Sequence, residues 1–196
     1  MQLASRRVVL CLAGAALVAP ARAADEPAAQ LIQKVAAEVI ELIKNTTGAQ
    51  REAGIRNVLT NYFDLPYMGR AALATHWEAT SPQQRERFLK AVISAEARAY
   101  SARFGQYGGQ TLTVTRVSAR PNGVSVVDSK LNQSNGQPIA MQWEVRDSGQ
   151  GLRITDVKIE GVSMVMTRRS DFNSYIVNNG GKVEALINEL EARAGR

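Results

Sequence analysis

The sequence predicts an α+β fold, in which a curved antiparallel sheet of about four strands packs against N- and C-terminal helices and encloses an apolar pocket. Apolar residues recur at helical spacing up to Phe104, at a spacing of two from Thr111, and at helical spacing again after Gly161. The strand-like segments are joined by short turns, which favours an antiparallel meander. Helices packed against one face of such a sheet can leave an apolar space between the two layers.

The first half of the chain is predicted to be helical. Leu31, Val35, Val39 and Ile43 recur every four residues and predict a helix over residues 27–46. Gly48 ends this helix, and a second apolar-faced helix follows it.

Two capping sequences mark the next helices. Asp64, followed by Pro66, predicts the start of a helix that runs toward Trp77. Ser81-Pro82-Gln83-Gln84 has the serine, proline and glutamine of a capping box, and it predicts a helix that ends at Gly105.

Four strands and two helices are predicted in the second half. The strands begin at Thr111 and then cover residues 124–131, 139–145 and 152–159, with turns at Asn122-Gly123, Asn135-Gly136 and residues 148–151. The helices are predicted over residues 171–178 and 182–194.

The N-terminus is typical of a cleaved signal peptide, residues 1–23. Arg6 and Arg7 precede an apolar run over residues 8–19, and Ala21-Arg22-Ala23 provides a cleavage site. The run is shorter than the roughly 20 residues that a transmembrane helix needs. Residues 24–196 are then predicted to form a single domain, exported by either the general or the twin-arginine route.

Charge and cysteine content exclude several function classes. The only cysteine, Cys11, lies in the predicted leader, so the mature chain has neither disulfide nor thiol chemistry. Removal of the three leader arginines leaves 21 of the 24 basic residues. With 18 acidic residues, the net charge of the mature chain is +3. This small excess does not indicate nucleic-acid binding.

The sequence also gives little support for an enzyme. It contains no phosphate-binding glycine motif, no zinc-protease motif and no nucleophile elbow, and no metal site or cofactor is expected. His76 is the only histidine. It could act as a general base with Asp64 or Asp171, which is the catalytic alternative to a binding function.

Three segments of the chain form an ordered pattern. The first runs from Phe63-Asp64 through His76-Trp77 to Phe88, the second is Met141-Gln142-Trp143, and the third runs from Asp156 through Thr167-Arg168-Arg169 to Leu190. Together they span nearly the whole predicted mature chain, and they resemble the toluene-tolerance family.

The resemblance implies a monomeric periplasmic carrier that holds phospholipid tails in an apolar cavity and is not an enzyme. Its partners would be an outer-membrane lipoprotein complex and the lipid-binding ring of an inner-membrane ABC transporter. Some family members are associated with hopanoid metabolism, so a hopanoid ligand remains an alternative. A periplasmic adaptor or holdase without a small ligand is a further alternative, which predicts a filled core.

Apolar residues on the expected inner faces are the candidate lipid contacts. They are Leu65, Met68, Leu73, Trp77, Val92, Val126, Met141, Val145, Val162, Met164 and Ile176. Candidate docking residues for the partners are Arg70, Arg98, Arg103, Arg168 and Arg169.

Overall fold

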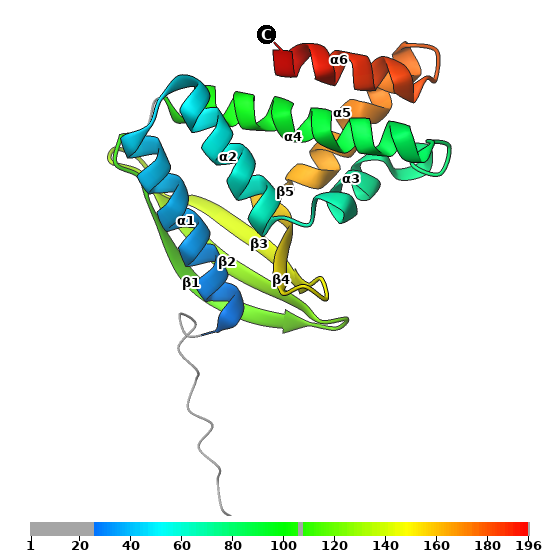
Figure 1. Cartoon of the computed structure of the whole chain (residues 1–196). Coiled ribbons are helices and arrows are strands. Elements are labelled where there is room, and N and C mark those ends of the chain that lie inside the picture. The colour runs from blue at the N-terminus through cyan, green and yellow to red at the C-terminus, as the bar shows by residue number, and fades with distance from the viewer. Residues whose placement is uncertain (1–25, 106–107, 196) are drawn as a thin grey trace, which may run out of the picture.

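The computed structural model describes residues 26–105 and 108–195, so the predicted signal peptide lies outside the described residues. Helices and strands follow one another in the predicted order (Figure 1). The helices are α1 (Pro27–Asn45), α2 (Gly48–Tyr62), α3 (Leu65–Leu73), a 3-10 helix (Ala74–His76), α4 (Pro82–Phe104), α5 (Met164–Asn178) and α6 (Val183–Gly195). The strands are β1 (Thr111–Arg120), β2 (Val124–Asn132), β3 (Ile139–Asp147), β4 (Leu152–Ile159) and β5 (Val162–Ser163).

The predicted helix caps are confirmed. The carboxylate of Asp64 accepts a hydrogen bond from the Tyr67 amide at 3.1 Å, which satisfies a free N–H in the first turn of α3. At the start of α4, Ser81 Oγ accepts from the Gln84 amide while Gln84 Oε1 accepts from the Ser81 amide. This reciprocal pair fixes where α4 begins.

The strands form one antiparallel sheet in the order β1-β2-β3-β4-β5, which confirms the predicted fold class. Shifts of register occur between Val114 and Arg116 on β1 and between Glu144 and Val145 on β3. Such irregularities bend a strand and increase its twist. They are consistent with the curved sheet seen in Figure 1.

The prediction for the fifth helix was wrong at its start. α5 begins at Met164, seven residues before the predicted Asp171, after a two-residue strand that was not predicted. Ser163 Oγ accepts from the Met166 amide at 3.1 Å, and Asp156 Oδ1 accepts from the Val165 amide at 3.2 Å. Cap and carboxylate together start the helix directly after the β4–β5 hairpin.

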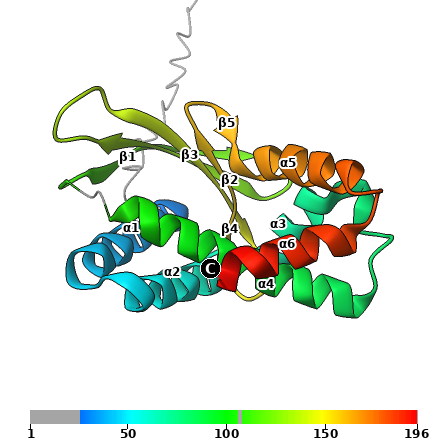
Figure 2. The ribbon, with the colours of Figure 1, turned by 90° about the horizontal axis from the view of Figure 1, so that it is seen from above.

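The helices gather on one side of the sheet, and α6 lies farthest from it (Figures 1 and 2). Two apolar clusters result. The sheet core joins α1 and α2 to the strands, and the helical core joins α3, α4, α5 and α6. The sheet core contains Ala28, Ile32, Val35, Val58, Val127, Val145 and Ile154. The helical core contains Ala72, Leu73, Phe88, Ala91, Phe172, Ile176, Val183, Leu186, Ile187 and Leu190.

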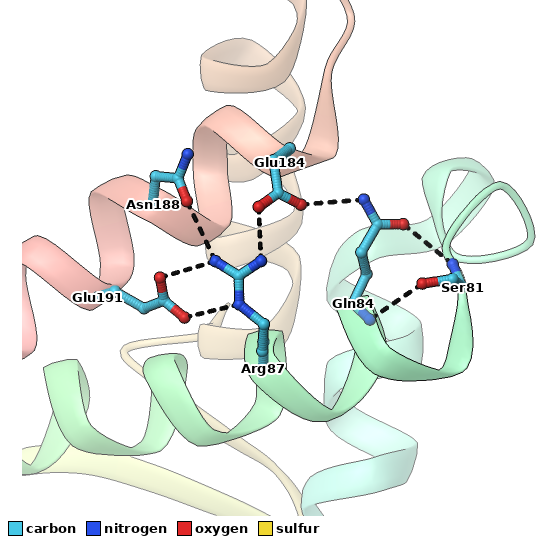
Figure 3. A network of polar contacts seen from close by, with 6 residues as sticks. All are labelled: Ser81, Gln84, Arg87, Glu184, Asn188 and Glu191. Carbon is cyan, nitrogen blue, oxygen red and sulfur yellow. Dashed lines mark hydrogen bonds and ion pairs between the residues drawn. The ribbon is translucent and has the colours of Figure 1, made fainter.

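A polar network holds α6 against α4 at the surface (Figure 3). Arg87 on α4 donates to Glu184 at 2.6 Å and to Glu191 at 2.8 Å, and its Nη2 also donates to Asn188. Gln84 donates to the other oxygen of Glu184 at 3.0 Å, which extends the network to the α4 cap. One arginine therefore contacts three side chains on successive turns of α6.

Candidate functional site

An apolar cavity of about 600 Å³ lies between the sheet and the helices. This volume is typical of a small-molecule binding pocket. Helices α1 to α5 and strands β1 to β4 all contribute to its walls. The predicted pocket is therefore present, and the filled core expected of an adaptor or holdase is not observed.

The helical walls follow from the sequence periodicity. On α1, Val35, Val39 and Ile43 are one turn apart and all line the cavity. Ile55, Val58 and Leu59 provide the same type of surface on α2. Gly69 brings α3 close to α4, since a Cβ at this position would lie 2.4 Å from Leu89 Cδ2.

The strand wall is built from alternate residues that face the helices. It includes Leu112, Leu131, Met141, Trp143 and Val157. The indole N–H of Trp143 donates to Ser129 Oγ at 2.9 Å, so its ring lines the cavity with its polar atom satisfied.

Polar side chains enter the cavity wall mainly from α4 and α5. We define the rim cluster as Glu96, Tyr100 and Arg103 on α4 together with Thr167 and Arg168 on α5, all of which line the cavity. The Arg168 Nε and Nη2 donate to the two carboxylate oxygens of Glu96 at 2.5 and 3.0 Å. Arg168 Nη1 also donates to Asp171 at 3.3 Å. The ion pair links the two helices beside the cavity.

The surroundings of the rim cluster change its acid–base properties. Burial raises the pKa of the Tyr100 phenol, and the Glu96 carboxylate raises it further. The hydrogen bonds that Arg168 donates to Glu96 raise the pKa of Arg168. Tyr100 is therefore neutral and Arg168 charged throughout the physiological pH range.

Five of the eleven candidate lipid contacts line the cavity: Leu65, Met68, Val92, Met141 and Met164. The other six lie elsewhere. Leu73 and Ile176 are fully buried in the helical core, and Trp77 packs against that core. Val145 belongs to the sheet core. The last two, Val126 and Val162, also lie off the cavity wall.

Strand alternation explains the position of Val126, whereas Val162 lies at the exposed end of a hairpin. Val126 is adjacent to the inward-facing Val127 and so points to the opposite face of the sheet. Val162 lies in the β4–β5 hairpin and is 57 % exposed. Neither position lines the cavity.

The main lining residues missed as lipid contacts are those of α1 and α2. Their four-residue periodicity was recognised as a helix face, but that pattern does not distinguish a face packed on a core from one that lines a cavity. Also unforeseen was the pairing of Arg168 with Glu96, which are 72 positions apart in sequence.

The residues of the catalytic alternative do not meet at the cavity. His76 Nε2 lies 3.0 Å from Asn173 Oδ1, Asp64 caps α3, and Asp171 pairs with Arg168. None of the three lines the cavity. Within residues 26–105 and 108–195, no group of three or more histidine, cysteine or acidic side chains could hold a metal ion.

The five docking candidates have different surroundings. Arg70 pairs with Glu78 at 2.7 Å, and Arg98 lies 3.8 Å from Glu52. Arg103 and Arg168 belong to the rim cluster. Arg169 is exposed and lines a small separate pocket between α3 and α5, together with Leu73, Ala74, Thr75, Met166, Ser170 and Asn173.

The comparison with protein families identifies the family of this chain. A family model described as MlaC protein matches residues 33–192. The chain belongs to the MlaC family. The recognition of a toluene-tolerance, MlaC-like sequence is thereby confirmed.

Two known proteins are similar to this chain. The intermembrane phospholipid transport system binding protein MlaC of Haemophilus influenzae is 25 % identical over 146 residues, which cover 72 % of this chain and 67 % of the relative. A solved structure of a phospholipid-binding protein from Ralstonia solanacearum, in complex with a phospholipid, has a TM-score of 0.71 at 21 % identity. That match covers 85 % of this chain and 96 % of the solved chain, and it shows that the two chains share a fold.

Proposed function

We propose that this protein binds phospholipid and carries it between membranes as part of an intermembrane phospholipid transport system. The observation that carries the proposal is the apolar cavity of about 600 Å³ in a chain of the MlaC family. The names of the two relatives, one a transport binding protein and one a phospholipid-binding protein, support the same class of ligand.

The cavity has the physical properties that such a carrier needs. A two-tailed lipid has roughly 30 methylenes, and each costs about 0.8 kcal/mol to expose to water, so free transfer would cost on the order of 20 kcal/mol. An apolar cavity removes much of this cost. It resembles the bilayer interior as a solvent for the tails, so loading and unloading can both proceed without chemistry.

The finer parts of the proposal concern compartment and partners. The mature chain would act as a monomer in the periplasm, after removal of residues 1–23. It would exchange lipid with an outer-membrane lipoprotein complex and with the lipid-binding ring of an inner-membrane ABC transporter. No catalytic group is required, which agrees with the separation of His76 from the cavity.

A pair of neighbouring alanines provides the test. Ala36 lines the cavity, whereas Ala37 is exposed on the same helix. The Ala36→Phe variant should take up much less fluorescent phospholipid from vesicles, because its ring occupies part of the cavity. Ala37→Phe adds the same ring outside and should load like the unmodified protein.

Native mass spectrometry of the purified protein provides a second readout. We expect co-purified phospholipid on the unmodified protein and on Ala37→Phe, and less on Ala36→Phe. Folded protein that is repeatedly free of lipid and takes up none from vesicles would refute the carrier function.

A further inference from the structure

The rim cluster contains both cationic side chains that line the cavity within the described residues. Arg103 and Arg168 come from different helices and lie on walls that are otherwise mostly apolar. Glu96, Tyr100 and Arg103 lie on successive turns of α4, and Glu96 is bound by Arg168 from α5. The cavity therefore has a polar, positively charged region beside its apolar interior.

The Arg168 guanidinium is arranged to bind two oxygen atoms of one planar or tetrahedral anion. It holds both oxygens of Glu96 with Nε and Nη2, and it is only partly exposed. A phosphate diester presents two anionic oxygens that fit the same guanidinium edge. The Glu96 carboxylate thus occupies the position that a phosphate would take.

Arg103 supplies a second positive charge in the same region. Its guanidinium lies 6.0 Å from the centroid of the Tyr100 ring. Among residues 26–105 and 108–195, no carboxylate pairs with Arg103 within salt-bridge distance, whereas Arg168 pairs with Glu96 and Asp171. An anion that binds at Arg168 would therefore also be attracted by Arg103.

We infer that Arg168 binds the phosphate diester of a lipid whose tails occupy the cavity, and that the phosphate displaces Glu96 from Arg168. This inference rests on the proposed lipid-carrier function and deepens it. It assigns the rim cluster to the recognition of phosphate-bearing lipids. Lipids with an uncharged head, such as diacylglycerol or a hopanoid alcohol, gain nothing from the exchange.

Variants of the two partners test the exchange. Arg168→Ala should weaken the binding of phosphatidylglycerol about 10-fold or more, since hydrogen bonds between charged groups contribute more than those between neutral groups. Arg168→Lys keeps the charge but loses the two-nitrogen edge, so its affinity should be intermediate. Glu96→Gln removes the competing negative charge and should tighten the binding of phosphatidylglycerol.

Arg169→Ala is the matched control. Arg169 follows Arg168 directly on α5 but lines the other pocket and is exposed. Neighbouring residues on a helix point in different directions, so this variant removes the same charge without touching the rim cluster. Its affinity for phosphatidylglycerol should equal that of the unmodified protein.

A comparison of three ligands distinguishes a phosphate-binding site from an ion pair that only holds α4 and α5 together. Each variant is titrated with short-chain phosphatidylglycerol, with diacylglycerol of the same tails, and with inorganic phosphate, and its melting temperature is recorded. We expect Arg168→Ala to leave diacylglycerol binding unchanged and inorganic phosphate to bind weakly to every variant. If Arg168→Ala does not fold, Glu96→Gln still tests the exchange, because it must favour phosphatidylglycerol alone.

Three results would overturn the assignment. If Arg168→Ala loses affinity equally for phosphatidylglycerol and diacylglycerol, the ion pair serves only to hold α4 and α5 together. Unchanged phosphatidylglycerol binding in Arg168→Ala or in Glu96→Gln would remove Arg168 from headgroup recognition. Tight inorganic phosphate binding that depends on Arg168 would indicate a free anion site. Failure of the unmodified protein to bind any lipid would instead refute the proposed function.

Discussion

Trp143 on β3 donates its indole N–H to the hydroxyl of Ser129 on β2, and the ring lines the cavity. The other tryptophan, Trp77, lies outside the cavity, where the Arg85 guanidinium stacks on it at 5.0 Å. The two indoles therefore report on different parts of the molecule.

Lipid loading should be visible in the fluorescence of Trp143 alone. Phospholipids with brominated tails should quench this residue, because the tails would contact its ring. Trp77→Phe should retain the quenching and Trp143→Phe should lose it. Quenching that persists in Trp143→Phe would place the tails near Trp77, outside the observed cavity.

The Arg87 network should stabilise the protein in a pH-dependent way. Hydrogen bonds from Gln84 and Arg87 lower the pKa of Glu184, and Arg87 lowers the pKa of Glu191. A carboxylate whose pKa is lower in the folded than in the unfolded protein stabilises the fold at pH values above its ordinary pKa of 4.5. This contribution is lost as the pH falls through the lowered pKa.

Urea unfolding at two pH values tests this network. Arg87→Met should unfold at lower urea than the unmodified protein at pH 7, and the difference should be smaller at an acidic pH below 4.5, as the two carboxylates become protonated. Arg193→Met is the control, because Arg193 pairs with Glu189 inside α6 and does not connect two helices. An equal effect of both variants would contradict a link between α4 and α6.

Replacement of Ala74 by glycine should stabilise the protein. It joins α3 to the 3-10 helix with φ 48° and ψ −119°, a conformation that side chains with a Cβ rarely adopt. Ala74→Gly should raise the free energy of unfolding by about 1 kcal/mol. Ala71→Gly, within α3, should lower it by about 1 kcal/mol. Losses in both variants would show that Ala74 is not strained.

His76→Ala should leave lipid uptake and release unchanged. His76 lies against Asn173 and outside the cavity, so its loss removes a surface hydrogen bond only. Uptake from vesicles and transfer to acceptor vesicles measure the effect. Loss of function with an unchanged melting temperature would instead favour the catalytic alternative.

Local sequence patterns predicted most of the elements because their signals are short-range. The Ser81 capping box, the Asp64 cap and the change from helical to alternating spacing each involve a few neighbouring residues. The start of α5 was missed because it depends partly on Asp156, which lies on β4, nine positions before the Val165 amide from which it accepts.

The cavity wall was predicted less completely, for a related reason. Apolar periodicity identifies the buried face of a helix, but it does not show whether that face packs against a core or lines a cavity. Leu73 and Met68 on α3 illustrate this: Leu73 is buried in the helical core and Met68 lines the cavity. The Arg168–Glu96 pair depends on the packing of α5 beside α4, which no local pattern contains.

The division of the interior into two cores has a consequence for cargo size. The cavity takes its walls from both cores, so its width depends on the spacing between two separately packed bodies. A small change in that spacing alters the cavity volume without creating a void inside either core. A void inside a packed core would cost far more free energy. If the cavity holds lipid as proposed, one molecule would accommodate tails of unequal length, and a loaded molecule, with its ligand in contact with both cores, should have a higher melting temperature than an empty one.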